Sequence, residues 1–184
     1  WEGKRFNSPN DLDFDAEGHL YFTDPPYGLK NMMQDTAKDI SFQGVYRLNV
    51  DGSLDLLVDT ISRPNGIGLS PDGSTLYIAN SDPKKAFWLA YDIAEDGSLE
   101  NARTFYDATA LVGAEGEAGL PDGFVVSSEG HVFATGPGGV WVFSPEGQPL
   151  GKIRTGVPTA NCTLDTDEST LYMTANNYLM RVKL

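Results

Sequence analysis

Short apolar runs recur along the chain, and in most of them hydrophobic and polar residues alternate. Alternation with a period of two predicts β-strands, and the Gly, Pro, Asp and Asn residues between the runs predict tight turns. Hardly any stretch shows the apolar spacing of an amphipathic helix. The pattern therefore predicts an all-β protein built from short strands.

One arrangement of these runs occurs four times: a short polar segment, a strand, a tight turn and a second strand. In the first two copies a further pair of runs follows, joined by the turns Asp51-Gly52-Ser53 and Asp96-Gly97-Ser98, and Asp-Gly between alternating runs is a strong hairpin signal. Four antiparallel strands in about 40–50 residues are typical of one blade of a β-propeller. The strands expected in these two copies are 12–14, 20–23, 44–48, 54–58, 67–69, 75–79, 87–91 and 103–106.

The repeats predict a single β-propeller domain in which about four blades are present. The longer intervals between the first copies indicate two insertions, 30–43 in the first blade and 109–119 before the third. The last copy stops after a third run, 179–184, so the fourth blade is expected to be incomplete. The predicted blades are 8–61, 62–118, 119–157 and 158–184.

A polar side chain occupies the same place in every repeat, just before or at the start of the first strand: Asn10, Asn65, Asp122 and Asn161. In an antiparallel hairpin, the start of the first strand lies at the same end as the finish of the second. We therefore expect these residues on one face, near the central channel, together with the segments that follow each second strand. The insertion at 30–43 joins that face and is expected to form a lid. Functional residues concentrate on such loops of a rigid scaffold.

The tripeptide Pro-Asp-Gly occurs twice, around Asp72 and around Asp122. Asp72 aligns with the acidic turn residues of the other repeats, which indicates a structural role in a hairpin turn. Asp122 aligns instead with Asn10 and Asn65, at the entry to an inner strand. Although the two aspartates have identical neighbours, their positions in the repeat predict different roles, and only Asp122 is a candidate functional residue.

Asn10, Asn65 and Asp122 come from three adjacent predicted blades and are expected to converge at the mouth of the channel. Amide and carboxylate oxygens are hard donors that suit Ca²⁺, Mg²⁺ or Mn²⁺. A bound divalent cation can polarise a carbonyl group or lower the pKa of a water molecule. The alternative interpretation is that Asn and Asp only cap turns here. Repetition at matching positions in three blades favours a site.

The composition narrows the classes of partner. The 184-residue chain has a net charge of −13, and an acidic surface repels phosphate backbones, which argues against nucleic acid. No apolar run approaches the roughly 20 residues of a membrane helix. The single cysteine, Cys162, allows no intrachain disulfide and is expected to be buried. Zinc-ligand spacing, a nucleophile elbow and a phosphate loop are absent, and His19 and His131 are expected on the opposite face.

Four motifs stand in order along the chain: Arg5-Phe6-Asn7-Ser8-Pro9-Asn10-Asp11, Phe22-Thr23-Asp24-Pro25-Pro26-Tyr27-Gly28, Arg63-Pro64-Asn65-Gly66 and Pro121-Asp122-Gly123. Together they resemble the SMP-30/gluconolactonase/LRE-like family of six-bladed β-propellers. The resemblance covers essentially the whole chain. It implies a metal-dependent hydrolase that opens sugar lactones, such as gluconolactone, by metal-assisted attack of water on the lactone carbonyl.

The resemblance also implies roles for single residues. Asn65 and Asp122 match two metal ligands, and Asn10 matches a ligand or substrate contact of the preceding blade. Asp11 matches the neighbour on the substrate side, so that Asn10 and Asp11 would hold sugar hydroxyls. Asp122 is the catalytic candidate, expected to orient or deprotonate the attacking water. The implied cofactor is one divalent cation, Ca²⁺ first, with Mg²⁺, Mn²⁺, Zn²⁺ or Fe²⁺ as alternatives.

Two features of the family are not matched. The family has six blades, and it takes a glutamate ligand from its first blade, whereas Glu2 lies too close to Asn10 to begin a separate blade. Because the chain also opens at Trp1 rather than at a methionine, we expect N-terminal blades to be missing. A lone fragment is expected to self-associate through its uncovered sheets, to bind metal weakly and to be inactive.

Two other functions remain open from the sequence. One is a non-catalytic propeller that binds Ca²⁺ or another protein, and the other is a phosphotriesterase-like hydrolase on the same fold. A soluble protein is expected in either case, and the sequence leaves the compartment open between cytoplasm and periplasm.

Overall fold

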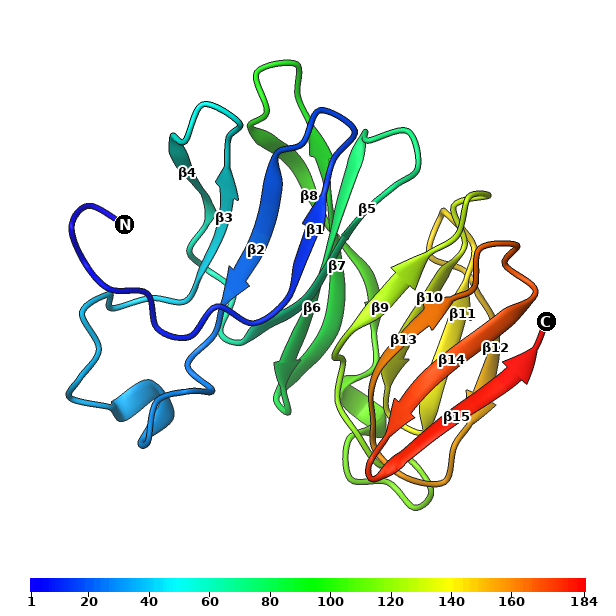
Figure 1. Ribbon diagram of the computed structural model, residues 1–184. Coiled ribbons are helices and arrows are strands. Elements are labelled where there is room, and N and C mark those ends of the chain that lie inside the picture. Colours follow the sequence, from blue (N-terminus) through cyan, green and yellow to red (C-terminus); the bar gives the residue numbers. More distant parts are fainter.

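The computed structural model describes residues 1–184 and consists of four antiparallel sheets set side by side (Figure 1). The first sheet holds β1 (Leu12–Phe14), β2 (Leu20–Asp24), β3 (Gly44–Leu48) and β4 (Leu54–Val58). The second holds β5 (Pro64–Leu69), β6 (Thr75–Asp82), β7 (Lys85–Ile93) and β8 (Leu99–Asp107). The third holds β9 (Phe124–Val126), β10 (Val132–Gly136), β11 (Gly139–Phe143) and β12 (Pro149–Arg154), and the fourth β13 (Thr159–Leu164), β14 (Thr170–Ala175) and β15 (Tyr178–Lys183).

Helical structure is limited to two short 3₁₀ turns, η1 (Met32–Gln34) and η2 (Thr109–Leu111), which lie in the two insertions. No helix of the structure has the length and hydropathy that crossing a membrane requires. The prediction of an all-β fold with four blades is confirmed.

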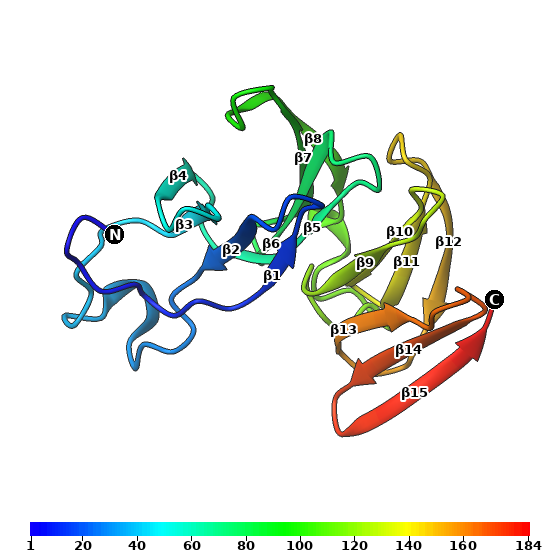
Figure 2. The same ribbon diagram turned by 45° about the horizontal axis from the view of Figure 1, so that its top comes forward.

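The strands of each sheet are arranged in chain order, and the first strands of neighbouring sheets contact one another: β1 with β5, β5 with β9, and β9 with β13. From these strands the sheets spread apart like the blades of a propeller, as the second view shows (Figure 2). The prediction that the first strands are innermost is therefore confirmed. It matters for function because the residues that precede these strands are brought close together.

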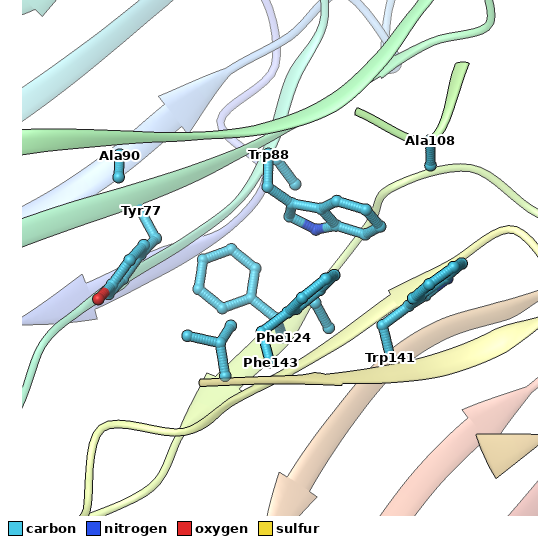
Figure 3. Close-up of a cluster of buried hydrophobic side chains, with 10 residues drawn as sticks. Tyr77, Trp88, Ala90, Ala108, Phe124, Trp141 and Phe143 are labelled. Carbon is cyan, nitrogen blue, oxygen red and sulfur yellow. The ribbon is translucent and has the colours of Figure 1, made fainter. Parts of the chain in front are cut away.

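Three hydrophobic clusters hold the blades together, one at each interface between neighbouring sheets. At the interface of the second and third blades, the indole of Trp88 lies 5.5 Å from the ring of Phe143, with Tyr77 and Trp141 nearby (Figure 3). Large aromatic side chains bury 150–250 Å² each, so such a cluster contributes strongly to docking one blade on the next. Cys162 is buried, as expected, in the cluster between the third and fourth blades.

The second blade differs from the prediction because its strands are longer than the apolar runs. β5 begins at Pro64, so that Asn65 lies inside the strand and not in the segment before it. The register of β5 on β6 shifts between Pro64 and Ile67, which is the mark of a β-bulge. Bulges turn a side chain away from its regular position, and this one decides where Asn65 points.

The polar segments before the first strands are fixed by side chains at the ends of the second strands. In the first blade, the buried carboxylate of Asp24 accepts hydrogen bonds from the backbone N–H groups of Asn7 at 2.8 Å and Ser8 at 2.7 Å. In the second blade, the Asn80 side-chain oxygen accepts one from the N–H of Arg63 at 2.9 Å. The two blades thus use the same device to hold the segments that lead to Asn10 and Asn65.

Candidate active site

A pocket of about 550 Å³ lies where the entries to the first three inner strands meet. The structure brings together three of the predicted residues there, because Asn10, Asn65 and Asp122 all line this pocket. The complete lining is Asn10, Tyr27, Arg63, Asn65, Ser81, Pro83, Val112, Gly119, Leu120 and Asp122. Asn161, the equivalent residue of the fourth blade, lines a different cavity, and its side-chain oxygen accepts a hydrogen bond from the N–H of Cys162.

Asn65 is held from both sides and is only 6% exposed. The Thr23 hydroxyl of the first blade donates to the backbone carbonyl of Asn65 at 2.8 Å. The side-chain amide Nδ2 of Asn65 donates to the Ser81 hydroxyl at 2.9 Å, and that hydroxyl donates in turn to the carbonyl of Pro121. One chain of hydrogen bonds therefore links three blades across the pocket.

Asn10 and Asp122 lie two residues before β1 and β9, yet backbone hydrogen bonds keep both in line with the sheets. The N–H of Asn10 donates to the carbonyl of Thr23 at 2.9 Å, and the N–H of Asp122 donates to that of Thr135 at 3.1 Å. Ladder bonds of this kind fix the backbone of both residues, so their side chains project from a rigid base. Asn10 is exposed, whereas Asp122 is half-buried.

The carboxyl group of Asp122 lies in an environment that disfavours its charge. Burial is the largest cause, and together with the nearby charge of Asp11 it raises the pKa of Asp122 to about 6, although the N–H of Gly123 and the Asn65 side chain oppose the shift. Burial likewise raises the pKa of Asp11. Neither carboxyl group forms an ion pair with Lys, Arg or His. Two desolvated carboxyl groups without a cationic partner make a favourable place for a cation.

Asp11 itself does not line the pocket. Its Oδ1 accepts a hydrogen bond from the N–H of Leu12 at 3.0 Å, and the residue is half-buried. Asp11 therefore acts on the pocket through its charge, which raises the pKa of Asp122.

The donors in the pocket fit a hard cation but are poor in carboxylate. The structure contains no group of three or more His, Cys, Asp and Glu side chains placed to hold a metal ion. The available ligands are the amide oxygens of Asn10 and Asn65 and the carboxylate of Asp122, and such oxygen donors suit Ca²⁺ and Mg²⁺ better than soft transition metals. Asn65 meets a further requirement, because its NH₂ group is used by Ser81 and its oxygen remains free.

The structure adds three polar residues that sequence reasoning did not single out: Tyr27, Arg63 and Ser81. The Tyr27 hydroxyl is buried without a hydrogen-bond partner, and burial raises its pKa. A signal for all three was present, since each lies in a segment that the hairpin topology assigns to the same face as Asn65.

The expected lid does not cover the pocket. No residue of 30–43 lines it. That insertion packs back on the entry segment instead: Ile40 is buried, the Arg5 guanidinium donates to the carbonyl of Ala37 at 2.7 Å, and the Asn7 amide donates to that of Phe42 at 2.8 Å. The second insertion, 109–119, takes the expected place and supplies Val112 and Gly119 to the lining.

Ion pairs anchor this second insertion to the third blade. Glu117 is buried and accepts hydrogen bonds from Lys152 and, at 2.9 Å, from Arg154. The Lys152 ammonium lies 4.2 Å from the ring centroid of Trp141. The hydrogen bond from Lys152, opposed by burial and assisted by Arg154, holds the pKa of Glu117 below its usual range. The wall of the pocket formed by the insertion is therefore fixed to β12.

A profile of the SMP-30/Gluconolactonase/LRE-like region matches residues 2–177, nearly the whole chain. The chain belongs to the SMP-30/gluconolactonase/LRE-like family. The gluconolactonase of Zymomonas mobilis is 41% identical to it over 185 residues, which is 100% of this chain and 52% of that protein. The lactonohydrolase oryL of Aspergillus oryzae is 31% identical over 182 residues, which is 86% of this chain and 40% of that protein.

The structural comparison agrees with this family. The solved structure of a gluconolactonase from Xanthomonas campestris superposes with a TM-score of 0.83 at 34% identity, and the match covers 100% of this chain and 59% of that one. The chain spans about half the length of the curated family members that it matches.

Proposed function

We propose that the full-length protein hydrolyses a sugar lactone with the help of one divalent cation. One observation carries this proposal: the pocket gathers Asn10, Asn65 and Asp122 from three blades of a gluconolactonase-like fold. The names of the similar proteins, gluconolactonase and lactonohydrolase, support the substrate class.

In this proposal Asn65, Asp122 and Asn10 hold the cation through side-chain oxygens. Ca²⁺ is the best candidate because the donors are hard and uncrowded, and Mg²⁺, Mn²⁺, Zn²⁺ and Fe²⁺ are the alternatives. When bound, the cation supplies Lewis-acid polarisation of a carbonyl oxygen. It would also compensate the charge of the desolvated Asp122 carboxylate.

The residues of the chain supply the proton chemistry. Water attacks the carbonyl carbon of the lactone, a new carbon–oxygen bond forms, and the bond between that carbon and the ring oxygen breaks. Asp122 accepts the proton of the attacking water and returns it to the ring oxygen, which leaves as a hydroxyl group. Burial raises the pKa of Asp122 to about 6 in the metal-free protein, so the group is ionised at neutral pH and able to accept a proton.

Binding and shielding complete the proposed cycle. Asn10 is exposed at the pocket and would hydrogen-bond sugar hydroxyls, while Asp11 would act on that side mainly through its charge. The insertion at 109–119 forms an apolar wall with Val112 and Leu120 beside it, which limits access of bulk water to the lactone.

The test is turnover of a panel of aldonolactones by the full-length protein in a pH-stat, with and without a chelator. Each turnover releases a hydroxy acid, so base consumption reports the reaction directly. We expect hydrolysis that stops on chelation and returns with Ca²⁺ or Mn²⁺. Cation binding without turnover would favour a non-catalytic module, and hydrolysis of an organophosphate but of no lactone would favour a phosphotriesterase. Either result would overturn the proposal.

A further inference from the structure

The Asn65 side chain can face the pocket with either of two chemically opposite groups. Its amide carries an oxygen that accepts hydrogen bonds and binds cations, and an NH₂ group that only donates. The two groups have nearly the same shape, so packing alone selects neither of them. What decides is the hydrogen-bond partner that the amide meets at the wall of the pocket.

That partner is the hydroxyl of Ser81, and its own proton is already used. The Ser81 oxygen lies within hydrogen-bond distance of both Asn65 Nδ2, at 2.9 Å, and the carbonyl oxygen of Pro121. A carbonyl oxygen can only accept, so the single hydroxyl proton must point to Pro121. Toward Asn65 the hydroxyl can then only accept, and the group that faces it must be NH₂. The amide oxygen is left for the pocket.

Because Asn65 and Ser81 are both buried, this orientation of the Asn65 amide is strongly preferred. Asn65 is 6% exposed and Ser81 is 7% exposed, so water has little access to repair a wrong arrangement. A reversed amide would place its oxygen against the lone pairs of Ser81, and leaving a buried polar group without its hydrogen bond is unfavourable.

The serine is specific to the second blade. The strand register equates Ile78 with Phe22 of the first blade and with Ala134 of the third, because each pairs with the residue two positions after Asn65, Asn10 or Asp122. Three residues further on, the second blade has Ser81, whereas the first and third blades have Pro25 and Pro137. Proline offers no hydroxyl. The second blade is also the one whose amide ligand is buried.

We propose that Ser81 is a positioning residue, which holds Asn65 with its amide oxygen toward the cation and at the same time holds Pro121, the residue before Asp122. This inference rests on the cation site of the proposed function. A single hydroxyl would thus set the direction of two of the three donors.

The first test needs no metal. In NMR spectra of the metal-free protein, the Nδ2 hydrogens of Asn65 should exchange with solvent slowly, and Ser81→Ala should accelerate their exchange by about tenfold or more. The matched control is Ser62→Ala, which removes another serine hydroxyl from the same blade, one that contacts Asn80 and Asp82 but not Asn65. Unchanged exchange in Ser81→Ala, or equal acceleration in both variants, would overturn the inference.

The second test measures the affinity for Mn²⁺ alone by calorimetry or electron paramagnetic resonance. Loss of a residue that orients a metal ligand costs about 10–100-fold in affinity, so Ser81→Ala should weaken binding by about tenfold. In an Asn65→Asp background the same substitution should cost much less, because both carboxylate oxygens can bind the cation. An equal loss in both backgrounds would assign Ser81 a general structural role and reject the inference.

The two tests separate the failure of this inference from the failure of the proposed function. If the wild-type protein binds no divalent cation, the proposed cation site is wrong, while the exchange rate of the Asn65 amide still decides whether Ser81 orients it. If cation binding and lactone turnover are both present but insensitive to Ser81→Ala, only the role of Ser81 is rejected.

Discussion

The two Pro-Asp-Gly segments of this protein place the same tripeptide in opposite environments. Asp72 is exposed in the turn between β5 and β6, where its Oδ1 accepts hydrogen bonds from the hydroxyl of Ser70 at 2.6 Å and from the N–H of Ser74 at 3.0 Å. These bonds lower the pKa of Asp72 to about 2. Asp122 is half-buried at the pocket, where burial raises its pKa to about 6.

The glycines that follow the two aspartates are also required for different reasons. Gly73 has a φ of +70° and open space around it, so it is needed for the left-handed backbone of the turn. Gly123 has an ordinary φ, but a Cβ there would overlap the side chain of Asn161. Gly73 is therefore required for its backbone conformation, and Gly123 because a side chain there would clash.

The comparison teaches that the position within the blade, and not the local sequence, sets the chemistry of an aspartate. An exposed turn between two strands surrounds the carboxylate with donors and water, which stabilise its charge. The entry to an inner strand surrounds it with neighbouring blades, which remove water and bring a second carboxylate close. Breaking the environment of one aspartate should therefore leave the other unaffected.

The largest effect is expected for the activity of the two alanine variants. Asp122→Ala should lower kcat/KM for the best lactone by at least about 100-fold, because it removes both a cation ligand and the proton acceptor. Asp72→Ala should retain activity within about twofold, since its side chain contacts only its own turn. Steady-state kinetics of the full-length protein measures both. Full activity in Asp122→Ala would remove this residue from the mechanism.

The second largest effect is expected on the free energy of unfolding of two glycine variants. One glycine is required because a side chain would clash, and the other because of its backbone conformation. Gly66→Ala would drive a Cβ into the backbone carbonyl oxygen of Asp122, and overpacking of this kind costs about 1–3 kcal/mol or more. Gly73→Ala meets nothing and suffers only the strain of a left-handed backbone, about 1–2 kcal/mol.

Denaturant unfolding gives the free energies for this pair, and cation affinity gives the specific readout. Only Gly66→Ala should also weaken binding of Mn²⁺, because it displaces Asp122. Equal effects of the two variants on the affinity would contradict the packing seen between the second and third blades.

A third expectation is an opposite dependence of stability on pH for the two aspartates. The folded-state pKa of Asp72 is lower than its unfolded value of about 3.9, so its contribution is present above that value and is lost as the pH falls through about 2. The folded-state pKa of Asp122 is higher than the unfolded value, so stability falls as the pH rises from about 4 to about 6 and stays lowered above that in the metal-free protein.

Asp122→Asn should therefore stabilise the metal-free protein at pH 7, and the gain should vanish near pH 4. Urea unfolding at the two pH values measures this, with Asp72→Asn as the partner variant that should destabilise at pH 7. NMR titration of the two carboxyl groups gives their order independently. A lower pKa for Asp122 than for Asp72 would contradict the comparison.

The smallest effect is expected at the wall of the pocket. Glu117→Gln removes the charge that binds Lys152 and Arg154, so the insertion at 109–119 should loosen and KM should rise several-fold with little change in kcat. Glu115→Gln is the matched control, because Glu115 is exposed in the same insertion and forms no ion pair. Equal KM values for the two variants would show that the ion pairs do not shape the pocket.

Much of the fold and the identity of the oxygen donors can be predicted from local sequence patterns. The four repeats, most strand positions and the meeting of Asn10, Asn65 and Asp122 follow from local patterns and from hairpin topology. These features are predictable because alternation, turn residues and antiparallel connection are properties of neighbouring residues.

The orientation and burial of the oxygen donors, by contrast, depend on contacts between blades. No single repeat predicts the β-bulge at Asn65 or the absence of Asn161 from the pocket lining. Nor does it predict that the insertion at 109–119, rather than the one at 30–43, lines the pocket. The contacts responsible join residues far apart in the chain, such as Thr23 to Asn65 across 42 positions and Ser81 to Pro121 across 40. The burial of Asn65, the pKa of Asp122 and the orientation of the Asn65 amide depend on these distant partners, so a local sequence pattern cannot predict them.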